Sequence, residues 1–485
     1  MKNIYIIIVF TLLSATAFAQ NKPVNNSKQS EEIVFLTTND IHGNIGNFAR
    51  MAFVVDSIKK IYDNVFILNA GDLFSGNPIV DMYPEKGFPM IDIMNKIGYT
   101  VSAIGNHEFD YGQEVLKKRM SEAKFPFICA NIISKSGIIS TPDAFYKLKT
   151  KNNLNITILS VIDNSANGKP ETHPTRIVGL EFPDPIPTAL KYKYLASKSD
   201  LLVALTHIGL ENDVELAKQM PEINLIVGGH SHTIIDSLMM VNGVLITQTG
   251  GKLRYLGEIK LVLQNGKITD KSYKLIDLKA QGGINQDIKK LADSYSKNPM
   301  LNQVLAKAKT KLTGNEELGC FYTDALREMN HFDIVFQNSG GIRIHEIPEG
   351  DITVETIYKM DPFGNYLMGL DMTTDEIRSL IKASFKDGGS NLRVSGIHYT
   401  IFKENNSVKE IQLTDYNEKP IDENRKYFVG MNDYILNTFQ FVHSDKGKSQ
   451  GVTTAEVIME YLKKVGEINY SGEKRSFLKD LDNKN

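Results

Sequence analysis

The sequence predicts a protein with two α/β domains. Its 485 residues are more than one hydrophobic core usually supports. Short apolar runs alternate with amphipathic stretches over residues 32–280, which is typical of β-α-β units. A stretch without strand patterning follows, and mixed patterning then resumes. We therefore expect one domain at 32–280, a helical linker at 281–312 and a second α/β domain at 313–485.

The amino terminus has the pattern of an export signal. Lys2 precedes the apolar run Ile4–Leu13, and Ala17-Phe18-Ala19 forms a small-x-small cleavage site. Residues 1–19 are therefore predicted to be a signal peptide, followed by a flexible polar tail at 20–31. An uncleaved anchor is the alternative, but the apolar run is shorter than the ~20 residues that a spanning helix needs. We expect an exported protein with no membrane span after cleavage.

Composition and charge exclude several classes of protein. With 42% hydrophobic and 23% charged residues, the chain is neither disordered nor fibrous. The 55 Lys and Arg residues nearly balance the 57 Asp and Glu residues, so no overall field favours a nucleic acid polymer or an anionic membrane. Cys129 and Cys320 fall in different predicted domains, and we expect two buried free thiols rather than a disulfide.

The first domain is predicted to contain strands at successive apolar runs. Helices are expected near 48–60, 90–96 and 113–122, between the first strands. Asn265-Gly266 predicts the turn of a β-hairpin at a sheet edge. The expected strands are IVFL, VFIL, VSAI, FPFICANI, ITILSVI, LLVAL, NLIVGG and GVLITQ.

The second half begins with the predicted linker. Residues 284–312 lack strand patterning and are predicted to be helical, with an interruption at Pro299. Beyond them, helical stretches separate the expected strands DIVFQN, YLMGLDM, HYTIF and KYFVGM.

Metal-binding side chains follow several of the predicted strands in the first domain. Ligands bind at the carboxyl ends of strands in open α/β sheets, so loops at these ends can converge on one crevice. The segments, five in number, are Thr38–Gly43, Gly71–Gly76, Gly105–Asp110, Thr206–Gly209 and Gly229–Thr233.

Each segment alone has an ordinary structural explanation. A single His after a strand is more often a turn residue, and Asp72 could bond the backbone of a turn. Asn106 could form an Asx-turn, and Asp110 could cap a helix. Five strand ends that all carry Asp, Asn or His would be improbable as unrelated local features, which favours a shared site.

The ligand types point to the metal. Imidazole and carboxylate groups without a thiolate suit Zn, Mn or Fe. A central carboxylate can bridge two divalent cations, and Asp72 is the best candidate for this bridge. The sequence therefore predicts two divalent metal ions that activate a water molecule.

These motifs resemble those of the calcineurin-like metallophosphoesterases. The chain is most similar to the exported 5′-nucleotidase family, which includes UDP-sugar hydrolases and cyclic-nucleotide phosphodiesterases, over nearly the whole mature chain. The resemblance implies a layered β-sandwich flanked by helices, with a helical linker to a second α/β domain. It implies Asp40, His42, Asp72 and His232 as ligands of one metal, Asp72, Asn106, His207 and His230 as ligands of the other, and His107 with Asp110 as the catalytic pair. Many members have Gln where this chain has His232.

The second half resembles the nucleotide-recognition domain of the same family. Arg343 suits a phosphate or carboxylate, and Phe363 could stack a base for about 1–3 kcal/mol. Asn365 could bond a base edge, while the resemblance implies that Gly396 and Tyr434 also bind substrate. A surface ion pair for Arg343, a core position for Phe363 and a turn at 362–364 are the alternatives.

Two family features of this half are missing from the sequence. The two upstream phosphate-binding arginines have no match, although Lys307, Lys309 and Lys311 lie nearby at a different spacing. The Gly-Gly-Asp segment expected after Asn432-Asp433-Tyr434 is also absent.

The expected function is a periplasmic phosphohydrolase that releases phosphate from nucleoside 5′-monophosphates or related nucleotides. A 2′,3′-cyclic-nucleotide phosphodiesterase, a UDP-sugar hydrolase or a broad phosphomonoesterase would use the same chemistry on another substrate. A non-catalytic nucleotide-binding protein is the alternative from a different class.

Overall fold

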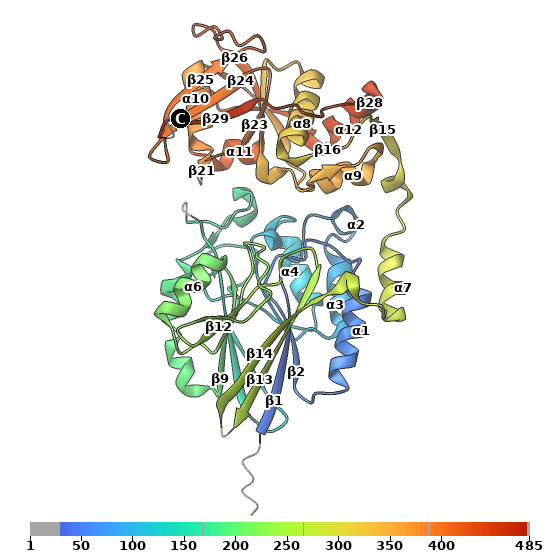
Figure 1. Cartoon of the computed structure of the whole chain (residues 1–485), viewed down its shortest axis with the longest axis vertical. Coiled ribbons are helices and arrows are strands. Elements are labelled where there is room, and N and C mark those ends of the chain that lie inside the picture. Colours follow the sequence, from blue (N-terminus) through green and yellow to red (C-terminus); the bar gives the residue numbers. More distant parts are fainter. Residues whose placement is uncertain (1–29, 166–167, 265, 387–388, 483–485) are drawn as a thin grey trace, which may run out of the picture.

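The computed structural model describes residues 30–165, 168–264, 266–386 and 389–482. The predicted signal peptide lies outside the described residues, as does most of the predicted tail. The last two tail residues, Ser30 and Glu31, belong to a strand instead, because their backbone pairs with Gln264 and Leu263. Among the described residues, no helix has the length and apolarity to span a bilayer. Figure 1 shows two domains, one above the other.

The first domain is a sandwich of two six-stranded sheets with helices outside. Apolar side chains from both sheets, such as Phe35 and Val203, form the core between them. One sheet has the order β14 (Lys267–Asp277), β13 (Tyr255–Gln264), β1 (Ser30–Thr38), β2 (Val65–Asn69), β3 (Val101–Ala103) and β4 (Phe127–Ile128). The other has the order β11 (Met239–Val241), β12 (Val244–Thr247), β10 (Leu225–Val227), β9 (Leu201–His207), β7 (Asn155–Ile162) and β6 (Phe145–Lys149).

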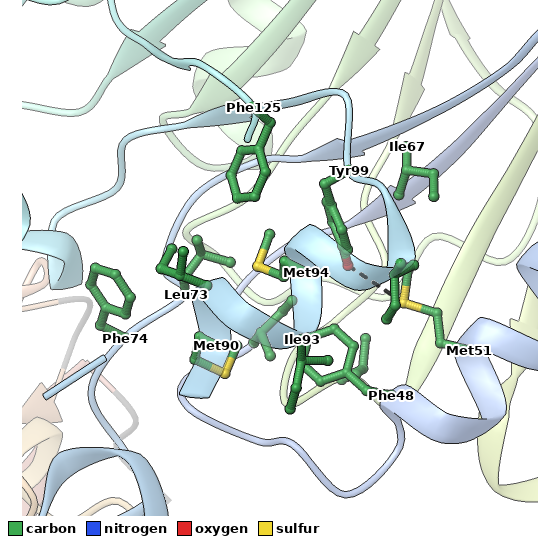
Figure 2. Packing of buried hydrophobic residues seen from close by; sticks show 14 of the residues in the cluster. Phe48, Met51, Ile67, Leu73, Phe74, Met90, Ile93, Met94, Tyr99 and Phe125 are labelled. Atoms are coloured by element: carbon green, nitrogen blue, oxygen red, sulfur yellow. Dashed lines mark hydrogen bonds between the residues drawn. The ribbon is translucent and has the colours of Figure 1, made fainter. Parts of the chain in front are cut away.

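The three expected helices cover the outer face of the first sheet. They are α1 (Phe48–Lys59), α3 (Phe88–Ile97) and α4 (Gln113–Glu122). Figure 2 shows Met90, Ile93 and Met94 of α3 packed near Phe48 of α1. The Tyr99 hydroxyl, buried in this cluster, donates a hydrogen bond to the Met51 sulfur over 3.4 Å. Helices α5 (Pro185–Leu190) and α6 (Leu210–Gln219) pack on the second sheet.

The predicted hairpin is confirmed. Strands β13 and β14 pair antiparallel as far as Gln264 and Lys267, and β14 forms the sheet edge. Cys129 and Cys320 are both buried free thiols, as expected.

The linker differs from the prediction. Helix α7 (Gln286–Tyr295) is followed by a short 3₁₀ turn (Pro299–Asn302) and then by strand β15 (Val304–Ala308), where helix was expected. Strand β15 pairs with β19 (Gly350–Thr353) and β28 (Glu467–Ile468). These pairings come from distant parts of the chain and override the local helical preference. Ile288 and Ala292 of α7 are buried in the first domain, whereas Leu301 is buried in the second.

The second domain is built around a five-stranded sheet. Its order is β23 (Leu392–Ser395), β17 (Ile334–Asn338), β26 (Tyr427–Asn432), β20 (Tyr366–Met372) and β27 (Lys448–Thr453). A three-stranded sheet joins β25 (Ser407–Thr414), β24 (His398–Glu404) and β29 (Ser476–Asp480). The helices are α8 (Gly314–Asn330), α9 (Val354–Met360), α10 (Thr374–Ala383), α11 (Asp433–Thr438) and α12 (Thr454–Val465). The predicted strands DIVFQN, YLMGLDM, HYTIF and KYFVGM correspond to β17, β20, β24 and β26.

Short elements complete the described part of the chain. The two-stranded pairs are β5 (Ile133–Ser134) with β8 (Leu180–Glu181), β16 (Leu312–Thr313) with β18 (Glu346–Ile347), and β21 (Phe385–Lys386) with β22 (Gly389–Ser390). Helix α2 (Pro78–Asp81) lies where the domains meet, and its Ile79 packs against the cores of both.

Candidate active site

The five predicted loops do meet at one edge of the sandwich. Strands β1, β2 and β3 are parallel to one another, as are β9 and β10, so their carboxyl ends lie together. Most of the predicted metal ligands in these loops have a left-handed backbone, which is strained for residues other than Gly. Those with positive φ are Asp40 (50°), His42 (48°), Asp72 (56°), His230 (80°) and His232 (51°). Strain is therefore concentrated at the side chains that are predicted to bind metal.

Asp72 lies at the centre of the cluster. One carboxylate oxygen, Oδ2, is 3.2 Å from His207 Nε2 and 3.9 Å from His42 Nε2. The other oxygen, Oδ1, accepts a hydrogen bond of 2.9 Å from the backbone N–H of His107. Asp72 is thus not a plain turn residue, and it stands between the two groups of predicted ligands.

The first group consists of Asp40, His42 and His232. The Nε2 atoms of His42 and His232 are 3.1 Å apart, and His232 Nε2 is 3.4 Å from Asp40 Oδ1. Two ring nitrogens that face each other beside carboxylate oxygens form a donor set that a cation fits. His232 therefore points its ring into the cluster.

The second group gathers around Asn106. Its Oδ1 lies 3.2 Å from His207 Nε2 and 3.1 Å from His230 Nδ1. Its Nδ2 donates to the carbonyl oxygen of Glu171, so Asn106 does not form an Asx-turn. All seven predicted ligands are brought together, and the imidazole, carboxylate and amide donors fit Zn, Mn or Fe.

Burial and charge tune this cluster. Burial and then the Arg343 guanidinium hold the pKa of His42 well below its usual value, which favours the neutral ring that binds metals. Burial alone would raise the pKa of Asp72, but His207 and His107 hold it well below its usual value. Burial alone would lower the pKa of His207, but the Asp72 carboxylate raises it to about 10. A cation that binds between Asp72 and His207 would therefore displace a proton.

His107 and Asp110 form the predicted pair. His107 Nδ1 lies 2.6 Å from Asp110 Oδ2. Burial alone would lower the pKa of His107, but the adjacent Asp110 carboxylate raises it above its usual value. Asp110 does not cap helix α4, whose N-cap is Gly112. The pair can therefore hold a protonated imidazole beside the metal cluster, at 4.9 Å between the His107 and His42 ring centroids.

Sequence reasoning missed Glu108. Its fully buried carboxylate accepts hydrogen bonds from the backbone N–H groups of Asp72 (2.9 Å), Leu73 (2.6 Å) and Gly105 (2.5 Å). Burial and the Asp72 charge raise its pKa to about 7. Glu108 ties the loop after β2 to the loop after β3. Its position between His107 and Asp110 was the available signal, and its carboxylate is occupied by backbone N–H groups.

A cavity of about 680 Å³ adjoins the metal cluster, and both domains line it. His107 and Asp110 contribute from the first domain. The predicted substrate-binding residues that line it are Arg343, Phe363, Asn365 and Tyr434.

Arg343 and Phe363 reach across the domain boundary. Arg343 Nη2 is 3.4 Å from His42 Nε2, so Arg343 does not form a surface ion pair. The Phe363 ring stacks on the His107 ring with centroids 5.7 Å apart and an interplanar angle of 19°, so it is not a core residue. The second domain thus brings an aromatic ring and a cation directly to the candidate site.

The structure does not bring Gly396 to this cavity. Gly396 has φ of +94°, and a Cβ there would overlap the carbonyl oxygen of Asp333. Its N–H donates to the Tyr416 hydroxyl over 2.7 Å. The glycine is needed for a tight backbone approach, and it is not among the residues that line the described cavity.

The three nearby lysines do not replace the missing arginines. Lys309 pairs with Glu467 at 2.7 Å and Lys311 with Glu346 at 2.6 Å. Lys307 lies on β15, and none of the three is among the residues that line the described cavity.

Comparisons with known proteins agree with this geometry. Residues 33–233 match the calcineurin-like phosphoesterase family, and residues 296–441 match the 5′-nucleotidase C-terminal domain. The chain is 28% identical over 465 residues to a 5′-nucleotidase of Vibrio cholerae, with 80% of this chain and 82% of that protein covered.

A second relative is much longer than this chain, and a solved structure matches it over nearly its whole length. The chain is 27% identical over 501 residues to the trifunctional nucleotide phosphoesterase YfkN of Bacillus subtilis, where 90% of this chain matches 34% of that protein. The chain thus spans about a third of the length of that relative. The solved structure of a 5′-nucleotidase precursor from Thermus thermophilus has the same fold, with a TM-score of 0.81, 23% identity, and 92% and 99% of the two chains covered.

Proposed function

Since the chain belongs to the calcineurin-like phosphoesterases that carry a 5′-nucleotidase C-terminal domain, and is a metal-dependent phosphoester hydrolase, we propose that it releases phosphate from nucleoside 5′-monophosphates in the periplasm. The observation that carries this proposal is the convergence of seven candidate metal donors, Asp72 at their centre, beside a cavity that both domains line. The predicted export signal supports the location.

The donor set supports a site for two cations. Asp40, His42 and His232 would hold one cation, Asn106, His207 and His230 would hold the other, and Asp72 would bridge them. Two divalent cations there would supply a water of lowered pKa and neutralise phosphate charge.

The remaining groups act on the substrate through the chain's own side chains. Hydrolysis forms a bond from water oxygen to phosphorus and breaks the bond from phosphorus to the ester oxygen. The His107 imidazolium, oriented by Asp110, is placed to donate a hydrogen bond to phosphate oxygen or a proton to the leaving oxygen. Arg343 would bind the phosphate. Phe363 and Tyr434, which line the same cavity, would hold the base.

The catalytic assignment is tested with AMP. Phosphate release by the purified mature chain is measured with Mn or Zn, for wild type and for the Asp72→Ala and His107→Ala variants. We expect turnover to fall at least ~100-fold in both, since each removes a metal bridge or a general acid. Asp63→Asn, in an exposed ion pair with Lys151, is the control and should retain wild-type turnover. Unchanged turnover in both site variants would reject the assignment.

A substrate panel separates the alternatives. The wild-type enzyme is offered AMP, 2′,3′-cyclic AMP, a UDP-sugar and p-nitrophenyl phosphate. Preference for AMP supports base stacking in the cavity, whereas preference for p-nitrophenyl phosphate over every nucleotide would contradict it. Tight AMP binding without hydrolysis under any metal would identify a non-catalytic binding protein.

A further inference from the structure

Three consecutive residues of the first domain, Glu171, Thr172 and His173, contact three different parts of the candidate site. The carbonyl oxygen of Glu171 accepts a hydrogen bond of 2.9 Å from Asn106 Nδ2. An amide side chain has its donor and its acceptor on opposite branches. Holding the donor of Asn106 therefore directs its Oδ1 toward His207 and His230.

Thr172 contacts Asp110, the partner of His107. Its hydroxyl donates a hydrogen bond of 3.0 Å to Asp110 Oδ1, while Asp110 Oδ2 faces His107 Nδ1 at 2.6 Å. The Thr172 side chain is buried, with 5% of the residue exposed. One carboxylate oxygen is thus fixed by Thr172, so the other is held toward the His107 ring.

His173 faces the second domain. Its Nε2 lies 3.4 Å from Asp433 Oδ2, and its Nδ1 lies 2.8 Å from the Thr175 hydroxyl. Asp433 Oδ1 accepts a hydrogen bond of 3.1 Å from the backbone N–H of Tyr366. Asp433 therefore stands between His173, with which it forms an ion pair when that ring is protonated, and the strand β20 that follows the loop of Phe363 and Asn365.

We propose that residues 171–173 are a positioning segment that couples the seating of the second domain to the alignment of the His107–Asp110 pair. Adjacent Cα atoms are about 3.8 Å apart across a peptide bond, so His173 cannot shift far without moving Thr172. When Asp433 holds His173, Thr172 is held against Asp110. The inference rests on the proposed function only in taking His107 and Asp110 as the groups that act on the phosphate ester.

The role of Thr172 is tested by removing its hydroxyl while its shape is kept. We expect Thr172→Val to lower kcat about 10-fold, because a misaligned catalytic group loses part of its contribution, with KM and bound metal unchanged. Thr172→Ser keeps the hydroxyl and should restore at least half of the wild-type kcat.

Thr188→Val is the matched control for this change. Thr188 is buried in the same domain, with 5% exposed, and its hydroxyl has no hydrogen-bond partner among the described residues. Its kcat should equal that of wild type. Bound metal is measured by elemental analysis after gel filtration. A wild-type kcat in Thr172→Val, or loss of metal from that variant, would overturn the positioning role.

The coupling is tested by a double-mutant cycle between Thr172→Val and Asp433→Asn. The Asp433→Asn change keeps an oxygen that can accept from the Tyr366 N–H, but it removes the charge that faces His173. In the Asp433→Asn variant the second domain no longer holds His173. Adding Thr172→Val to this variant should therefore lower kcat by less than a further 3-fold. An equal 10-fold loss in both backgrounds would refute the coupling.

Both p-nitrophenyl phosphate and AMP are used as substrates throughout. A hydrogen bond from His107 to phosphate oxygen stabilises the transition state whatever the leaving group, so the Thr172→Val loss should appear with either ester. Hydrolysis of p-nitrophenyl phosphate without hydrolysis of AMP would reject the proposed nucleotidase function, while the positioning segment would still be decided by the aryl ester.

Discussion

Asp361 is a buried carboxylate next to the loop that carries Phe363 and Asn365. Its Oδ2 accepts hydrogen bonds from the Tyr322 hydroxyl, at 2.7 Å, and from the Thr454 hydroxyl. Tyr322 lies on α8 and Thr454 begins α12, so Asp361 joins two helices immediately before Phe363. Burial raises its pKa to about 6. One residue therefore links the packing of the second domain to the position of a residue that lines the cavity.

The raised pKa of Asp361 predicts how the unfolding free energy changes with pH, and the Asp361→Asn variant tests this prediction. A folded pKa of about 6 lies above the usual value of 3.8, so the folded state holds this proton more tightly. The stabilisation is complete below pH 3.8 and is lost as pH rises through about 6. From pH 5 to pH 8 wild type should lose about 1 kcal/mol of unfolding free energy that Asp361→Asn does not lose. Urea denaturation of both metal-free proteins at the two pH values measures this difference.

At the scale of elements, the loops after β2 and β3 approach so closely that one of them requires glycine. A Cβ at Gly105 would overlap the Asp72 carboxylate and lie 2.7 Å from the Asp72 backbone nitrogen. Glu108 also binds the N–H groups of both loops. The position of Asp72 thus depends on the spacing between two neighbouring strand ends.

Gly105→Ala should therefore displace Asp72 and abolish metal retention, with at least a ~100-fold loss of turnover. Gly46→Ala is the matched control, because a Cβ at Gly46 meets no atom within 4 Å. Metal content and phosphate release are measured for both variants. Full metal content in Gly105→Ala would show that the site tolerates wider loop spacing.

The same elements show what the sequence could reveal. Periodicity located α1, α3 and α4, and the motifs at strand ends located the side chains that the structure gathers around Asp72, because both signals are local. Strand β15 was missed because its pairing with β19 and β28 depends on residues far along the chain. The support given by Thr172 to Asp110 was equally invisible, since 62 residues separate them.

At the scale of the whole molecule, the site is completed by residues that cross from one domain to the other. Lys252 of the first domain donates a hydrogen bond of 3.1 Å to the backbone carbonyl of Arg343. The Arg343 side chain then reaches His42. Arg343 is therefore held by the first domain while it belongs to the second.

Arg343→Ala should raise the KM for AMP about 10- to 100-fold, since hydrogen bonds to charged groups contribute about 1.5–3 kcal/mol. Metal content should not change, because Arg343 is not a metal donor. Arg425→Ala, which removes an arginine paired with Asp333 in the same domain, is the control and should leave KM unaltered. Steady-state kinetics distinguish the two, and an unchanged KM in Arg343→Ala would exclude Arg343 from substrate binding.

Helix α7 belongs mechanically to the first domain. It packs on α1 and α3, and its Tyr295 hydroxyl donates a 2.7 Å hydrogen bond to Asp92. The chain passes from one hydrophobic core to the other between Ser296 and Met300. Any rotation of the second domain relative to the first would have to take place within residues 296–300. The ring of Pro299 already fixes one backbone torsion there. A protease that cut there would leave two fragments, each with its own packed interior, joined only through their shared surface.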